Sequence, residues 1–180
     1  MKNYNCIFLD RDGTLNPDSG YIDSLDNFKF FDFTISSLMK IANDNNQFCI
    51  ISNQSGIGRG IIKQEELFKI HNYIKKSFKQ HNIPLLDIYF CADHPDSATE
   101  RRKPGPGMFL EAEIKYNLSL MDCLMIGDSI DDMRAGEMLC MDTMLVLTGE
   151  GEKTYSNLLE FEKPTYIVND LSDGADLLCQ

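Results

Sequence analysis

Short runs rich in β-branched and aromatic residues alternate along this chain with longer segments whose apolar positions recur at helical spacing. Such alternation is typical of βαβ units around a parallel sheet. The runs predict six strands, over residues 5–9, 47–51, 86–91, 123–126, 143–147 and 166–168. The spacing predicts helices over 35–42, around 67–78, from 106 onwards and over 130–139, with the first helix ending at 43–46. We therefore expect a single α/β domain over residues 1–180, with a doubly wound, Rossmann-like parallel sheet and helices on both faces.

Composition and charge narrow the range of partners. The 180 residues are 43% hydrophobic and 25% charged, which is the balance of a globular domain, and the net charge is -11. That field would repel a phosphate backbone, so we expect no nucleic-acid partner. The apolar runs are too short to span a bilayer, and residues 1–5 lead into no secretory signal. We expect a cytoplasmic protein that acts as a monomer without membrane contact.

The six cysteines form no C-x-x-C pair. Three of them lie inside apolar runs that are predicted to be strands. All six are therefore expected to be buried, reduced thiols.

Polar clusters follow the predicted strands at four places, over residues 10–14, 52–56, 101–104 and 127–132. Ligands of open parallel sheets bind beyond the carboxyl ends of the strands, where the winding direction reverses. Functional residues are therefore expected just after each strand.

Three aspartates are candidates for a metal site. Asp10 and Asp12 lie two positions apart at the end of the first strand, where side chains of an extended chain point to the same side. Two carboxylates in one pocket repel each other unless a cation lies between them, and Asp128 is available as a third ligand. Hard oxygen donors of this kind favour Mg²⁺. With the metal bound, one aspartate can attack phosphorus while its neighbour protonates the leaving oxygen.

These aspartates also have a purely structural interpretation. An Asp-x-Asp pair by itself favours a solvated loop, and its combination with Gly-Asp-x-x-x-Asp and Lys-Pro at other strand ends favours function. Asp131 is interpreted as a carboxylate in the first turn of a helix, stabilised by the helix dipole. Asp132 is expected to join the metal shell.

Two further clusters carry groups that can hold a phosphoryl group. Ser52 supplies a hydroxyl, Asn53 and the amides after it supply neutral donors, and glycines at 56, 58 and 60 allow a ligand close to the backbone. Lys103 supplies a positive charge for the equatorial oxygens of a transferring phosphoryl group. Pro104 and Pro106 stiffen its surroundings.

The motifs resemble those of a known enzyme family. FLDRDGTLN (8–16), SNQSGIGRG (52–60), RKPGPGM (102–108) and IGD (126–128) look like the four motifs of haloacid dehalogenase superfamily phosphatases. More narrowly, they are similar to the D-glycero-D-manno-heptose 1,7-bisphosphate 7-phosphatases and to the related histidinol-phosphate phosphatases. The spacing between the motifs leaves no room for either of the usual cap domains. We therefore expect an uncapped site whose loops select the substrate.

The resemblance implies a Mg²⁺-dependent phosphomonoesterase. Asp10 would be the nucleophile, and Asp12 the general acid and then the base. Ser52 and Lys103 would hold the phosphoryl group. Mg²⁺ would bind to Asp10, the backbone carbonyl of Asp12, and Asp128. The implied substrate-binding loops contain Asp18, Ser19, Gly20, Tyr21, Ser52, Asn53, Gln54, Ser55 and Arg102.

The chain departs from these relatives at two places. The relatives carry a zinc loop in which one Cys and one His precede the lysine, and a Cys-x-Cys pair lies just before Arg-Lys-Pro. Here only Cys91 is kept, and the other three positions hold Asp93, Thr99 and Arg101. We expect no structural zinc, because one thiolate and one adjacent imidazole cannot complete a four-coordinate site. The second departure is Ser129, where relatives often have a lysine.

The expected function is removal of the 7-phosphate of a heptose 1,7-bisphosphate, a small phosphorylated sugar, through a phospho-aspartate. Arg59, Arg101 and Arg102 favour a substrate with a second anionic group, because the chain is otherwise strongly acidic. Two alternatives stay open: a histidinol-phosphate phosphatase, and a non-hydrolytic phospho-accepting or binding domain. Asp12 favours an enzyme, since hydrolysis needs a base for the water.

Overall fold

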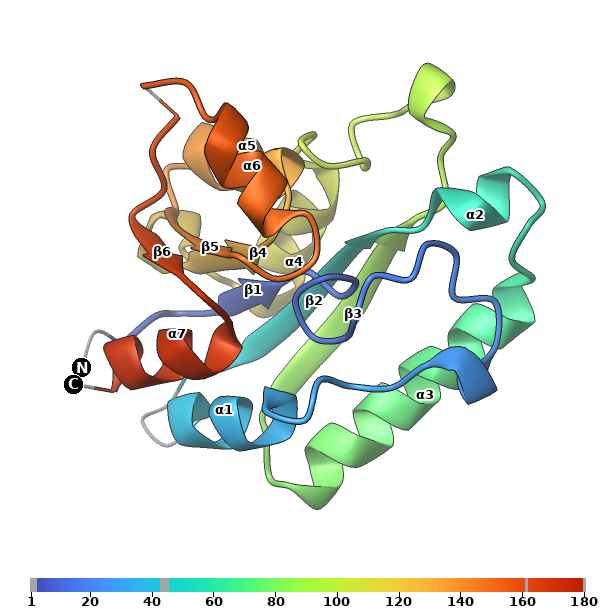
Figure 1. Cartoon of the computed structure of the whole chain (residues 1–180), viewed down its shortest axis with the longest axis horizontal. Coiled ribbons are helices and arrows are strands. Elements are labelled where there is room, and N and C mark those ends of the chain that lie inside the picture. Colours follow the sequence, from blue (N-terminus) through green and yellow to red (C-terminus); the bar gives the residue numbers. More distant parts are fainter. Residues whose placement is uncertain (1–2, 43–45, 161, 180) are drawn as a thin grey trace.

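The computed structural model of the chain describes residues 3–42, 46–160 and 162–179. Its centre is a six-stranded sheet in which all neighbouring strands are parallel. The strands are β1 (Ile7–Leu9), β2 (Phe48–Asn53), β3 (Leu85–Cys91), β4 (Leu124–Gly127), β5 (Asp142–Val146) and β6 (Tyr166–Val168). They lie in the order β3-β2-β1-β4-β5-β6 (Figure 1), and the predicted fold class is confirmed.

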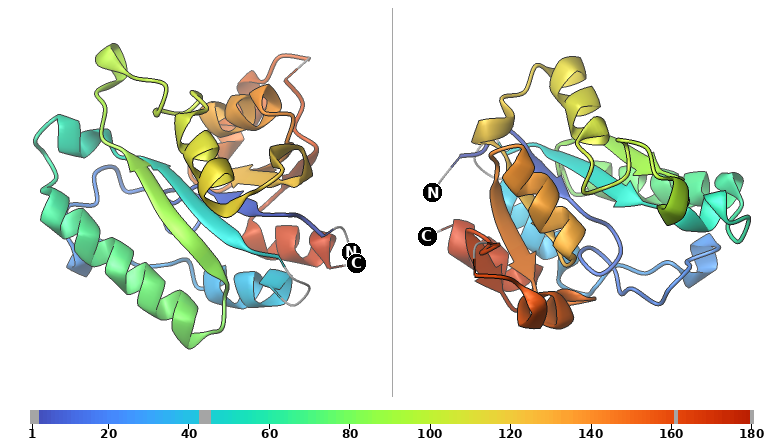
Figure 2. Two further views of the ribbon diagram at one scale, coloured as in Figure 1. Left: turned by 180° about the vertical axis from the view of Figure 1, so that it is seen from behind. Right: turned by 90° about the horizontal axis from the view of Figure 1, so that it is seen from above.

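Helices cover both faces of this sheet (Figure 2). The α-helices are α1 (Thr34–Ile41), α2 (Ser55–Gly58), α3 (Gln64–Gln80), α4 (Gly107–Tyr116), α5 (Ile130–Met138), α6 (Gly151–Asn157) and α7 (Leu171–Leu178). Apolar side chains of α1, α3 and α7 pack in one core layer, and those of α4 and α5 pack in the other. Short 3-10 helices occur at Leu25–Asn27, Pro95–Ser97 and Leu120–Asp122.

Strand β1 is buried on both sides. Ile7 and Leu9 belong to the first core layer, whereas Phe8 belongs to the second and its ring meets Phe109 of α4 edge-on at 5.1 Å. Strands buried on both faces are apolar throughout, and β1 has this composition. The packing holds β1 in the middle of the molecule, so the residue that follows it emerges at the carboxyl edge of the sheet.

The winding direction reverses at β1. The chain builds outward from β1 to β2 and β3, and then returns to the other side of β1 to form β4. The backbone amide of Asp10 donates to the carbonyl of Ile126 at 2.9 Å, which joins the carboxyl ends of β1 and β4. A reversal of this kind opens a crevice for a ligand beyond the strand ends.

The observed elements differ from the prediction in two ways. Strand β2 continues to Asn53 because Ser52 and Asn53 still pair with β3, so both residues are strand rather than loop. Helices α2, α6 and α7 were not predicted, and α7 begins where the side chain of Asp170 caps it. Of the predicted helix end at 43–46, residues 43–45 lie outside the described residues.

The cysteine prediction is wrong at two positions. Cys140 is exposed and Cys179 is half-buried, whereas the other four cysteines are buried. Cys140 lies in the turn two residues after α5, and Cys179 directly follows α7, so both lie where a helix ends at the surface. Across the described ranges, no helix has the length and apolar character needed to cross a membrane.

Candidate active site

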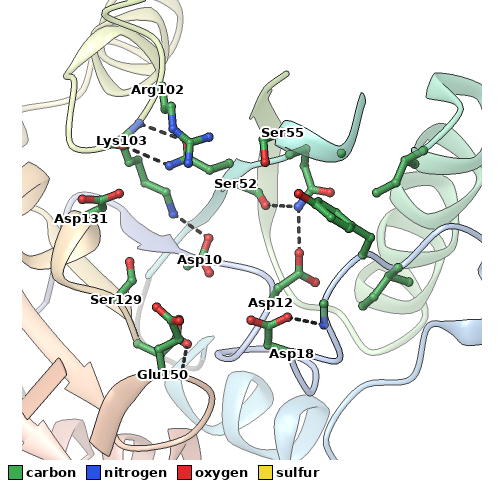
Figure 3. A pocket seen from close by; sticks show the side chains of 18 residues that line it. Asp10, Asp12, Asp18, Ser52, Ser55, Arg102, Lys103, Ser129, Asp131 and Glu150 are labelled. Carbon is green, nitrogen blue, oxygen red and sulfur yellow. Dashed lines mark hydrogen bonds and ion pairs between the residues drawn. The ribbon is translucent and has the colours of Figure 1, made fainter. Parts of the chain in front are cut away.

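A pocket of about 310 Å³ opens beyond the carboxyl ends of β1, β2 and β4 (Figure 3). Its lining includes Asp10, Asp12, Asp18, Gly20, Tyr21, Ser52, Asn53, Gln54, Ser55, Arg102, Lys103 and Asp128. All of these were predicted as site residues from distant parts of the sequence. Ser19, Arg59 and Asp132 were predicted with them but do not line the pocket.

Lys103 joins two carboxylates in the floor of the pocket. Its ammonium nitrogen lies 2.6 Å from Oδ1 of Asp10 and 2.6 Å from Oδ1 of Asp132, and it donates to the carbonyl of Ile51 at 2.8 Å. Burial works against the charged form, but the two carboxylates outweigh it and raise the pKa of Lys103. All three ammonium protons have acceptors among the described residues, so Lys103 fixes the Asp10 carboxylate. Its contact with a phosphoryl group stays a prediction.

Three carboxylates gather around this lysine. Oxygens of Asp10, Asp128 and Asp132 lie within 4.8 Å of one another. Burial and the neighbouring negative charges raise the pKa of Asp10 to about 7 and that of Asp128 to about 8. In the described part of the chain, Asp10 accepts only through Oδ1 and Asp128 only through Oδ2. The other oxygen of each can therefore bind a hard cation.

Asp132 also takes part in capping the start of α5. Its Oδ2 accepts from the hydroxyl of Ser129 at 2.6 Å and from the Ser129 amide at 3.1 Å, while its own amide donates back to that hydroxyl. This reciprocal capping box leaves neither oxygen of Asp132 without a partner. Asp132 therefore supports Lys103 and α5. Its place in the metal shell stays a prediction, since one of its oxygens lies within 4.8 Å of oxygens of Asp10 and Asp128. Asp131, predicted as a helix-turn carboxylate only, also lines the pocket.

Asp12 lies outside this carboxylate cluster. Nε and Nη2 of Arg11 donate to its two oxygens at 2.9 and 2.6 Å, and Asn16 and Gln54 donate at 2.9 and 2.8 Å. Burial raises the pKa of Asp12, but the Arg11 guanidinium outweighs it and the pKa falls below its ordinary value. Gln54 also donates to Oγ of Ser52 at 2.8 Å, so the amide couples the two predicted catalytic side chains.

Two residues of this network were missed. Arg11 is fully buried and Asn16 is fully buried, although neither is apolar. A charged residue directly between two strand-end aspartates was the available signal for Arg11. Asn16 had no comparable signal, because its partner is set by the turn at 11–16.

The segment after β5 completes the wall around Asp128. The amide of Glu150 donates to Oδ2 of Asp128 at 2.8 Å, and the hydroxyl of Thr148 donates to the carbonyl of Gly13. Gly13 has φ +87°, and a Cβ there would lie 2.0 Å from Oδ2 of Asp128. Sequence reasoning missed Thr148 and Glu150, although both follow a predicted strand, where function was to be sought.

Asn53 holds the backbone on which Lys103 is mounted. Its side-chain nitrogen donates to the carbonyl of Lys103 at 3.1 Å, and its side-chain oxygen accepts from the amide of Lys103 at 3.1 Å. The paired bonds tie the end of β2 to the loop between β3 and α4. Asn53 therefore lines the pocket and also positions the lysine.

Arg102 lies at the mouth of the pocket. It is the single arginine among the described residues that line the pocket. Arg59 is exposed just after α2, and Arg101 pairs with Glu111 and donates to the carbonyl of Phe90. Of the three arginines predicted over the site, only Arg102 therefore lines this pocket. Local partners hold Arg101, and Arg59 lies outside the wall of this pocket. On the opposite side, Figure 3 shows Asp18 facing the cavity.

Comparison with known proteins places these motifs in context. A family model described as HAD-hydrolase-like matches residues 100–174. A D-glycero-beta-D-manno-heptose-1,7-bisphosphate 7-phosphatase of Photorhabdus laumondii is 34% identical over 175 residues, covering 93% of this chain and 91% of that protein. A protein of the same name from Yersinia pestis is 36% identical over 159 residues, covering 81% of this chain and 85% of its own.

Solved structures give the same result. The D,D-heptose 1,7-bisphosphate phosphatase of B. bronchiseptica, complexed with magnesium and phosphate, has a TM-score of 0.87 and 30% identity. The match covers 96% of this chain and 97% of that one. The corresponding phosphatase of Burkholderia thailandensis has a TM-score of 0.72 and 26% identity, with coverage of 97% and 99%. The likeness therefore extends over nearly the whole chain and is not confined to the motifs.

Proposed function

Because the chain belongs to the haloacid dehalogenase-like phosphatases, we propose that it removes the 7-phosphate of D-glycero-D-manno-heptose 1,7-bisphosphate in a Mg²⁺-dependent reaction. The observation that carries the proposal is the Asp10 carboxylate in the pocket floor. One of its oxygens is fixed by Lys103 at 2.6 Å, and carboxylate oxygens of Asp128 and Asp132 lie within 4.8 Å. The resemblance to phosphatases of this name supports the choice of substrate.

The donor set fits Mg²⁺. Asp10, the backbone carbonyl of Asp12, and Asp128 would hold the ion, and all three offer hard oxygen atoms. Gly13 leaves the space beside Asp128 that a side chain would fill. When bound, Mg²⁺ supplies positive charge that draws electrons from the phosphoryl oxygens.

The protein's own residues divide the reaction into two steps. An oxygen of Asp10 forms a bond to phosphorus while the bond from phosphorus to the sugar oxygen breaks. Arg11 holds the pKa of Asp12 low in the free pocket, so Asp12 takes up a proton when the substrate binds and gives it to that leaving oxygen. Water then attacks phosphorus, its proton returns to Asp12, and cleavage of the aspartyl-phosphate bond restores Asp10 and releases phosphate. Ser52 and the amides after it hold the phosphoryl oxygens during both steps.

Arg102 is the candidate for a distal anionic group of the substrate. It lines the pocket, it is half-buried, and a guanidinium can hold a phosphate by two hydrogen bonds. The distal end of histidinol phosphate is instead a cationic amine, which Arg102 would repel. Arg102 therefore supports a bisphosphate over histidinol phosphate. At the opposite rim, Asp18, Gly20 and Tyr21 would contact the sugar, and Ser55 would lie between the two ends.

The remaining assignments concern the protein as a whole. The protein is proposed to act as a monomer on a small phosphorylated sugar, without a membrane partner. The net charge of -11 argues against a nucleic-acid partner. We place the enzyme in the cytoplasm, where a small phosphorylated sugar is available as substrate.

Steady-state kinetics with Mg²⁺ test the function directly. Heptose 1,7-bisphosphate should have a higher kcat/KM than histidinol phosphate, and Asp10→Asn should abolish turnover of both while the protein stays folded. Arg102→Ala should lower kcat/KM for the bisphosphate by the equivalent of about 1.5–3 kcal/mol, the value of a charge-assisted hydrogen bond. A wild-type preference for histidinol phosphate would contradict the substrate assignment. Near-native turnover by Asp10→Asn would contradict the mechanism.

A further inference from the structure

The loop between β3 and α4 carries both cations that line the pocket, and Figure 1 shows it rising above the strand ends. Its course is fixed by tight turns. The amide of Gly105 donates to the carbonyl of Arg102 at 2.7 Å, and that of Gly107 donates to the carbonyl of Glu100 at 2.7 Å. Lys103 is anchored separately through Asn53. How Arg102 is oriented depends on contacts earlier in the loop.

Asp93 and Thr99 form the first of these contacts. Oδ2 of Asp93 accepts from the Thr99 amide at 2.7 Å and from the Thr99 hydroxyl at 2.6 Å. These two bonds close the segment 93–99 into a ring and hold the pKa of Asp93 below its ordinary value. A carboxylate with two donors on one oxygen fixes its own backbone as well as that of its partner.

The same two residues contact Arg102. The amide of Arg102 donates to the carbonyl of Thr99 at 3.1 Å, and its Nη1 donates to the carbonyl of Asp93 at 3.4 Å. No other hydrogen bond of the guanidinium occurs within the described residues. The hydrogen-bond circuit therefore starts at the Asp93 side chain, passes through Thr99 and Arg102, and returns to the Asp93 carbonyl. We call these three residues the Asp93–Thr99–Arg102 clasp.

We infer that Asp93 and Thr99 are positioning residues that aim the Arg102 guanidinium at the distal anionic group of the substrate. The inference rests on the proposed function, because it requires a sugar bisphosphate in the pocket. Asp93 and Thr99 do not line the pocket, so their effect on the substrate passes through Arg102. The Thr99 hydroxyl also accepts from the amide of Arg101 at 3.3 Å, which holds the backbone directly before Arg102. The clasp thus determines substrate preference without contact to the substrate. The guanidinium keeps donors for a phosphate because the clasp uses one nitrogen only.

The test compares two substrates in the presence of Mg²⁺. Heptose 1,7-bisphosphate has a distal phosphate, and 4-nitrophenyl phosphate has none. Thr99→Val keeps the shape of the side chain and removes the hydroxyl donor, whereas Thr99→Ser keeps the hydroxyl. Asp96→Asn is the matched control, because it removes an exposed carboxylate from the same loop without a contact to Arg102.

Thr99→Val should raise KM for the bisphosphate between about twofold and tenfold, the range for one hydrogen bond. The ratio of kcat/KM for bisphosphate over 4-nitrophenyl phosphate should fall with it, and Thr99→Ser should restore the ratio. Asp96→Asn should keep the wild-type ratio. In the double variant Thr99→Val with Arg102→Ala, the ratio should be no lower than in Arg102→Ala alone, since the two residues act as one unit.

Results that contradict the clasp can be distinguished from results that contradict the proposed function. If the wild type prefers the bisphosphate but Thr99→Val leaves the ratio unchanged, or if its effect adds to that of Arg102→Ala, the clasp is overturned alone. Equal losses on both substrates indicate a general structural role and overturn it also. If the wild type has no preference for the bisphosphate, the proposed function fails, and the clasp as a device of substrate selection fails with it.

Discussion

The ammonium nitrogen of Lys103 lies 2.6 Å from Oδ1 of Asp10, although 93 positions separate the two residues in the chain. The lysine side chain is 2% exposed, and Asp132 occupies a second of its protons. The contact fixes the proposed nucleophile between the loop before α4 and the start of α5. It also leaves two carboxylates and one ammonium group buried together, so the free energy of unfolding depends on the ammonium charge.

Lys103→Met should destabilise the metal-free protein by about 3–5 kcal/mol, because it leaves Asp10 and Asp132 buried without a cation. Urea unfolding in a chelator measures this. Added Mg²⁺ should recover part of the loss. Lys115→Met is the matched control: Lys115 also pairs with a carboxylate, Asp87 at 2.7 Å, but is 56% exposed. It should lose no more than about 1 kcal/mol, and equal losses in the two variants would contradict the account.

Gly13→Ala should lower kcat by about 100-fold, because its methyl group would displace the Asp128 carboxylate, and displacements near 1 Å have effects of this size. The Mg²⁺ concentration that gives half of the maximal rate should rise as well. Gly60→Ala isolates the backbone strain, since Gly60 also has positive φ, +69°, but nothing within 4 Å of an added Cβ. Similar activity in both alanine variants would rule out a role for the contact with Asp128.

The purified protein should contain no stoichiometric zinc. Cys91 is buried, and the carboxylate of Asp93 is already bound by Thr99. Threonine and arginine are not zinc ligands, so no four-coordinate site can form in this loop. Elemental analysis measures the metal content, and chelation should affect only the Mg²⁺-dependent turnover. One tightly bound zinc per chain is the result that disproves this expectation.

His71 should make the protein less stable in mild acid. Burial lowers its pKa from 6.5 to about 3, so the folded chain binds no proton at this site where the unfolded chain does. The contribution of neutral His71 to the free energy of unfolding is at its full value above pH 6.5. It is lost as the pH falls from 6.5 toward 3. From pH 7 to pH 5 the loss is about 2 kcal/mol.

The difference in unfolding free energy between wild type and His71→Gln isolates this effect from the carboxylates. That difference should shrink by about 2 kcal/mol from pH 7 to pH 5. A pH-independent difference for His71→Gln would refute the buried neutral histidine.

Local patterns were sufficient to predict the parallel sheet and the place of the site. Apolar runs mark strands whichever partner they pair with, because burial on both faces requires apolar side chains along the whole strand. Asp10 and Asp128 directly follow such runs, and the reversal of winding at β1 brings any residues at those positions together. The family resemblance rested on these same strand ends. The fold and the candidate catalytic residues could therefore be predicted from the sequence before any contact was known.

Contacts between loops could not be predicted from local sequence patterns. Asp12 is held by Gln54, 42 positions away, and Lys103 by Asp132, so neither orientation follows from a spacing in the chain. Arg101 and Arg102 are neighbours in sequence, yet only Arg102 lines the pocket, because Glu111 binds the other. Hydrogen bonds of this kind depend on turn geometry and on partners supplied by another element, which no periodicity of one segment encodes. The tertiary structure alone decided which of the charged side chains line the pocket and which hold them in place.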